Sequence, residues 1–98
     1  MLETDIQKAI MKYLKAKGYM VWKNLTEGAR TGGRGRGKNP NKGIPDICAV
    51  KDGVTHYIEI KRPEGKLSEH QIKWHQEAYR HGVIVHVVTS LDQIKEIF

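Results

Sequence analysis

The stretch Asp46-Ile-Cys-Ala-Val-Lys-Asp-Gly-Val-Thr-His-Tyr-Ile-Glu-Ile-Lys61 decides the fold. It holds two β-prone runs, 46–51 and 54–61, with the dipeptide Asp52-Gly53 between them. Asp-Gly is a favoured sequence for two-residue type I′ turns, which join antiparallel strands. The stretch therefore predicts a tight hairpin in which Lys51 faces Val54 and each further pair lies one residue further from the turn on both strands.

This register brings three chemically active side chains together. It places Asp46 opposite Glu59, and carboxylates at such positions repel each other unless a cation lies between them. Because side chains alternate along a strand, Lys61 projects from the same face as Glu59, whereas Ile60 points the other way. The pattern indicates a site for a hard divalent ion, Mg²⁺ or Mn²⁺, held by one or two carboxylates together with water and substrate oxygens.

The flanking sequence predicts the other elements. An apolar stripe at helical spacing and a following Gly18 indicate an N-terminal helix. Ser68-Glu-His-Gln71 has the form of a capping box at the start of a second helix, and Ser90 caps a third. The strand-prone run before Ser90 is long enough for a buried strand, parallel to the second hairpin strand. The predicted elements are a helix over 3–16, strands over 19–23, 46–51 and 54–61, a helix over 69–81, a strand over 83–89 and a helix over 91–98.

Composition sets broader limits. With 98 residues, 39% hydrophobic and 29% charged, the chain fits one α/β domain with a mixed sheet flanked by helices. Its longest apolar runs fall well short of the roughly 20 residues needed to cross a bilayer, and the N-terminus lacks an export signal. Cys48 is the single cysteine. These features favour a cytoplasmic protein with no membrane partner.

A net charge of +6 favours a polyanionic partner. Six of the ten glycines lie in residues 26–43, which predicts a flexible loop. We expect this loop to grip the DNA backbone, although a solvated linker is the alternative. Its basic residues are Arg30, Arg34, Arg36, Lys38 and Lys42.

Three segments resemble the VRR-NUC branch of the PD-(D/E)xK nuclease superfamily, in its small stand-alone form from phages and bacteria. They are Gly43-Ile-Pro-Asp46, Tyr57-Ile-Glu-Ile-Lys61-Arg-Pro63 and Leu67-Ser-Glu-His-Gln71-Ile-Lys-Trp74. The likeness spans nearly the whole chain and implies a restriction-endonuclease-like core. The motif P-D…E-x-K is short and occurs by chance, so its position across a hairpin carries more weight than its letters.

The resemblance also implies roles for single residues. Asp46, Glu59, the backbone carbonyl of Ile60 and Glu3 would bind Mg²⁺ or Mn²⁺, and Lys61 would be the catalytic lysine. Gln71 would support the lysine or the substrate. Stand-alone members resemble Holliday-junction resolvases, which implies a homodimer acting on branched DNA, with no small-molecule cofactor.

Structural alternatives exist for each of these residues. Asp46, Glu59 and Lys61 could form a surface ion cluster, Gln71 could serve only the capping box, and Glu3 could favour the helix N-terminus. Trp22 and Trp74 fit a core or a dimer interface better than base stacking. The five histidines and one cysteine lack the spacing of a zinc site. As a whole, the chain could be a non-catalytic DNA-binding module; an enzyme acting on another phosphate substrate is disfavoured because no GxxxxGK[ST] loop is present.

Overall fold

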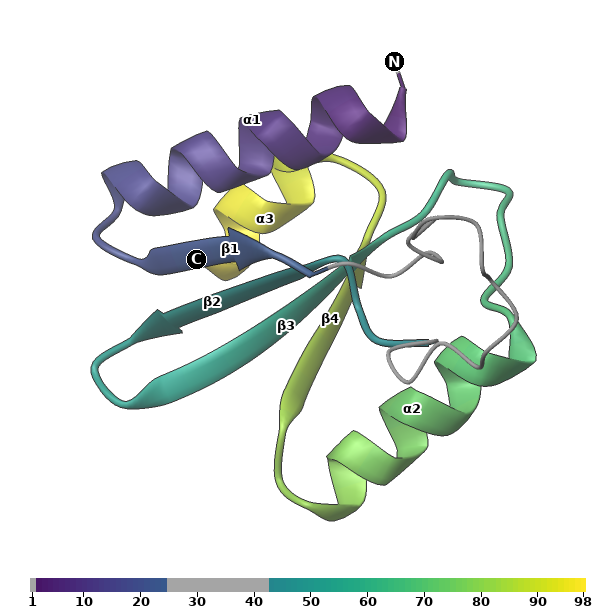
Figure 1. The fold of residues 1–98 in the computed structure, drawn as a ribbon. Helices are drawn as coiled ribbons and strands as arrows, with labels where there is room; N and C mark the ends of the chain where they lie inside the picture. Colours follow the sequence, from purple (N-terminus) through teal and green to yellow (C-terminus); the bar gives the residue numbers. More distant parts are fainter. Residues whose placement is uncertain (1, 25–42) are drawn as a thin grey trace, which may run out of the picture.

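The predicted order of elements is confirmed by a computed structural model that describes residues 2–24 and 43–98. In Figure 1, α1 and α3 lie on one side of a mixed sheet, and α2 lies apart from them beside β4. None of the helices in the described residues is long and apolar enough to cross a membrane. The elements are α1 (Glu3–Ala16), β1 (Met20–Lys23), β2 (Ile47–Lys51), β3 (Val54–Ile60), α2 (Glu69–Arg80), β4 (Ile84–Val88) and α3 (Leu91–Ile97).

The hairpin has the predicted register. Lys51 is the partner of Val54, and Ile47, at the other end of β2, is the partner of Ile58. Asp52 and Gly53 both adopt positive φ angles, of 51° and 79°, as a type I′ turn requires. Since the register extends unchanged toward the start of β2, it brings the segment containing Asp46 against the end of β3.

The sheet has the order β1-β2-β3-β4. β2 pairs antiparallel with β1 on one side and with β3 on the other. β3 and β4 run parallel and are connected through α2, as predicted. The expectation that the last strand is buried is wrong in part. β4 is an edge strand, and Ile84 and Val87 are 42% and 47% exposed, so its β-branched run reflects strand formation more than burial.

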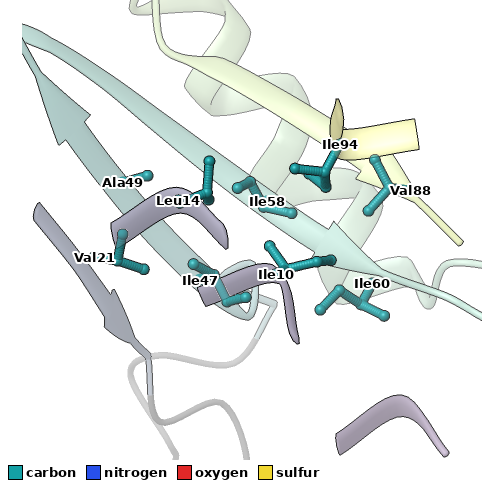
Figure 2. Packing of buried hydrophobic residues seen from close by; sticks show 9 residues of the cluster. All are labelled: Ile10, Leu14, Val21, Ile47, Ala49, Ile58, Ile60, Val88 and Ile94. Carbon is teal, nitrogen blue, oxygen red and sulfur yellow. The ribbon is translucent and has the colours of Figure 1, made fainter. Parts of the chain in front are cut away.

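The hydrophobic core lies on one face of the sheet, under α1 and α3. Ile10 and Leu14 of α1 pack against strand residues such as Ile58, and Ile94 of α3 closes the other end (Figure 2). Each of these four side chains is completely buried. The spacing of the apolar residues on α1 and their alternation on β2 and β3 are what direct them to a common face.

The opposite face is covered less completely. Tyr57 packs against Trp74 of α2, with ring centroids 4.9 Å apart. Trp22 is the register partner of Cys48 but remains 41% exposed, so a core position is wrong for this residue. This second face carries the candidate site.

Candidate functional site

Asp46 lies at the bend that leads into β2. Its Oδ2 atom accepts a hydrogen bond of 2.8 Å from the backbone N–H of Ile60, at the end of β3. The backbone carbonyl of Asp46 accepts a second hydrogen bond of 2.8 Å from Asn24, beyond β1. Asp46 is therefore tied to the strands on both sides of it, which fixes its carboxylate beside the β3 end.

The preceding residues fix the approach of this segment to α2. Gly43 has a φ angle of 92°, and a Cβ atom placed there would lie 2.4 Å from the backbone oxygen of His70. Only glycine tolerates both this conformation and this contact. The Gly43-Ile-Pro-Asp46 segment is thus held against the first turn of α2, and the predicted motif is a packing element as well as a source of the aspartate.

Glu59 is the one buried charged residue among the described part of the chain, with 1% of its surface exposed. It belongs to β3 but points to the face opposite Ile58 and Ile60. Gln71 donates a hydrogen bond of 3.0 Å to its Oε2 atom, and Nε2 of His75 lies 3.1 Å from Oε1. A buried carboxylate is costly unless it has such partners.

The pKa of Glu59 is shifted by its burial and by the charged side chains around it. Burial, followed by the adjacent carboxylate of Asp46, raises the pKa of Glu59 from 4.5 to about 8, while Lys61 acts in the opposite direction and Glu3 adds a further unfavourable charge. The structure therefore brings together the predicted Asp46, Glu59 and Lys61. Their mutual effects are those expected of two acids and one amine sharing a small volume.

Lys61 and Glu3 also line an open pocket of about 450 Å³. The other residues around it include Arg62 and Lys66 from the segment after β3 and Thr4 from the first turn of α1. Three basic side chains and one acidic side chain thus surround an open space that Lys61 connects to the carboxylate pair. Its excess of positive charge favours an anionic group of a substrate.

Gln71 serves the capping box and the site together. Its Oε1 atom accepts from the backbone N–H of Ser68 at 2.8 Å, its own backbone N–H donates to the Ser68 hydroxyl at 3.1 Å, and its amide nitrogen binds Glu59. The two alternatives for this residue are therefore compatible, because each uses a different end of the same amide.

The sequence did not predict that His75 contacts Glu59. His75 follows Gln71 by four residues, so both side chains lie on the same face of α2. The four-residue spacing between Gln71 and His75 was the sequence signal for this contact. It predicts the contact only once Gln71 is known to face Glu59.

The paired carboxylates fit a hard divalent ion. Their oxygens are the ligands that Mg²⁺ uses, and Mg²⁺ needs only one or two carboxylates from the protein. No group of three or more acidic, histidine or cysteine side chains converges as an ion site within residues 2–24 and 43–98. Glu3 thus lines the adjoining pocket without joining Asp46 and Glu59 in one ligand cluster, and the Ile60 carbonyl stays a predicted ligand.

The predicted DNA-binding residues lie outside the described part of the chain. They are Arg30, Arg34, Arg36, Lys38 and Lys42. Their role therefore stays a prediction.

Comparison with known proteins places these features in a family. The family model of the VRR-NUC domain matches residues 3–92. A solved structure described as a VRR-NUC domain is similar with a TM-score of 0.74 and 27% identity, covering 97% of this chain and 91% of that chain. No curated protein matches the chain. Because the family model spans nearly the whole sequence, the chain belongs to the VRR-NUC family and is a nuclease-type domain.

Proposed function

We propose that this domain is a Mg²⁺- or Mn²⁺-dependent endonuclease that hydrolyses phosphodiester bonds of DNA. The observation that carries the proposal is the burial of Glu59 beside Asp46, since burial first and the Asp46 carboxylate second raise the pKa of Glu59 to about 8. Two carboxylates held together at such a cost are relieved by a cation. Family membership supports the nuclease chemistry, and the pocket beside Lys61 supports an anionic substrate.

Asp46 and Glu59 would hold the ion, which when bound lowers the pKa of a water molecule and offsets charge that builds up on the phosphate. Lys61 lies close enough to Glu59 to influence its charge. Its amine would orient the attacking water or stabilise the developing negative charge. Gln71 would keep the Glu59 carboxylate facing Asp46 through its hydrogen bond to Oε2. The attack forms a new phosphorus–oxygen bond, and the bond to the leaving sugar oxygen breaks.

We further propose branched DNA, such as a Holliday junction, as the preferred substrate and a homodimer as the active form. Resemblance to stand-alone relatives motivates both. Symmetric cleavage of two strands also calls for two related active sites. Light scattering at working concentration tests the dimer, and a monomer would count against it.

The test compares labelled duplex, single-stranded and four-way-junction DNA in Mg²⁺, Mn²⁺ or EDTA. Wild-type protein should cut in either metal and stop in EDTA. The Asp46→Asn and Lys61→Ala variants should lose at least about 100-fold in rate, the lower range for groups that position or transfer protons. Lys95→Ala on α3 is the charge-matched control, because it removes one lysine from the opposite side of the sheet.

Two results would refute the proposal: no cleavage with either metal, or undiminished cleavage by both variants. The non-catalytic alternative makes a different prediction. It expects salt-sensitive DNA binding that needs no metal and persists in Asp46→Asn, because backbone contacts depend on cationic side chains. Binding without scission in every condition would therefore favour that class of protein.

A further inference from the structure

His75 makes a contact that the proposed chemistry does not use. The side chains of His75 and Glu59 are 15% and 1% exposed, and their closest atoms are 3.1 Å apart. Gln71 holds Oε2 of the same carboxylate and His75 reaches Oε1. Both oxygens of Glu59 are thus bonded to successive turns of α2, which fixes the plane of the carboxylate.

The direction of this hydrogen bond follows from the chemistry of its two partners. An ionised carboxylate can only accept, whereas an imidazole ring can donate an N–H. When Glu59 is ionised, Nε2 of His75 must therefore be the donor. Each carboxylate oxygen then keeps a second lone pair that α2 does not use.

Two observations separate this contact from simpler interpretations. Within residues 2–24 and 43–98, no three acidic, histidine or cysteine side chains form a group that could hold an ion, whereas His75 does contact Glu59. The same helix also carries a second histidine–glutamate pair, His81 and Glu77, 3.0 Å apart with side chains 70% and 59% exposed. Such exposed pairs contribute little, whereas a donor to a buried carboxylate is hard to replace.

We propose that His75 is a positioning residue for Glu59, holding Oε1 so that the carboxylate is oriented for binding a divalent ion together with Asp46. This inference rests on the proposed function. Gln71 and His75 together would then hold both oxygens of the Glu59 carboxylate. Partners that orient metal ligands in this way typically change metal affinity by about 10- to 100-fold when removed.

The experiment measures Mn²⁺ binding by calorimetry on metal-free protein without DNA. His75→Leu removes the donor, His75→Gln keeps an N–H at a similar reach, and His81→Leu is the matched control on the same helix. We expect the dissociation constant to rise about 10- to 100-fold in His75→Leu. It should stay within about threefold of wild type in His75→Gln and His81→Leu. Circular dichroism verifies folding; if His75→Leu does not fold, His75→Asn, with its shorter side chain, replaces it.

The outcomes distinguish this inference from the proposed function. If wild-type protein binds no Mn²⁺, or if Asp46→Asn binds it equally well, the proposed function fails. If wild type binds, Asp46→Asn does not, and the donor-removed variant binds like wild type, His75 is not a positioning residue. A His75→Gln variant as weak as the donor-removed variant also overturns the inference, because a restored donor would then have no effect. Loss in the donor-removed variant with recovery in His75→Gln supports it.

Discussion

The two faces of the sheet bury different chemistry. Under α1 and α3, Ile58 is completely buried among apolar side chains that are themselves buried. On the other face, the next residue in sequence, Glu59, is equally buried but charged, and its register partner Val87 is 47% exposed. Burial of the apolar face therefore stabilises the fold, whereas burial of the ionised Glu59 carboxylate on the other face lowers the free energy of unfolding. This difference predicts that substitutions on the two faces separate stability from activity.

The largest effect on stability should come from the apolar face. Ile58→Ala should cost about 2–5 kcal/mol, because it removes buried methylene groups and leaves a cavity between the sheet and the helices. Urea denaturation followed by circular dichroism measures this cost. Val87→Ala is the control from the other face and should cost less than about 1 kcal/mol, since much of that side chain is already in water. Equal costs for the two variants would contradict the contrast between the faces.

The second effect is the pH dependence that Glu59 gives to the metal-free protein. Its pKa in the folded state is about 8, against an ordinary value of 4.5, so the folded protein keeps a proton that the unfolded chain has lost. Stability from this group is therefore full below pH 4.5 and declines as pH rises through 8. Between about pH 6.5 and 8.5 the loss from Glu59 should be about 2 kcal/mol, because each pH unit is worth about 1.4 kcal/mol up to the folded-state pKa of about 8 and almost nothing above it.

Comparison with Glu59→Gln isolates Glu59 from the other titrating groups. The partly buried histidines, including His75, have lowered pKa values, so they act in the opposite direction, mostly below and partly above their ordinary pKa of 6.5. Burial raises the pKa of Cys48 from 9.0, so its contribution changes only above this pH window. Glu59→Gln should remove this loss from the profile measured by urea denaturation in EDTA. A wild-type profile parallel to that of Glu59→Gln would show that Glu59 ionises normally in the folded protein.

The sequence predicted the apolar face better than the site. Alternation and the Asp52-Gly53 turn set the hairpin register, which in turn placed Asp46 near Glu59, and these are local signals. The burial of Glu59 was not predictable, because it depends on where α2 crosses the second face. The same tertiary placement decides that His75 touches Glu59 and that β4 is a half-exposed edge. Local patterns thus identify which residues share a face, whereas coverage of that face comes from packing.

The smallest predicted effect separates the two functions of Gln71. Ser68→Ala removes the hydroxyl that accepts from the Gln71 backbone and should cost about 1 kcal/mol of stability. It leaves the backbone N–H of Ser68, which holds the Gln71 amide oxygen, so Mn²⁺ affinity should stay near the wild-type value. Gln71→Glu has the reverse design. Its carboxylate can still accept from Ser68, as capping boxes allow, but it cannot donate to Glu59 and adds a negative charge beside it.

We therefore expect Gln71→Glu to weaken Mn²⁺ binding by about tenfold or more while helix α2 stays capped. Urea denaturation measures the stability of each variant, and calorimetry measures its Mn²⁺ affinity. If Ser68→Ala weakens metal binding as much as Gln71→Glu does, the helix cap and the metal site are not separable. In that case the orientation of the Glu59 carboxylate depends on the position of the whole first turn of α2 more than on the hydrogen bond from the Gln71 amide.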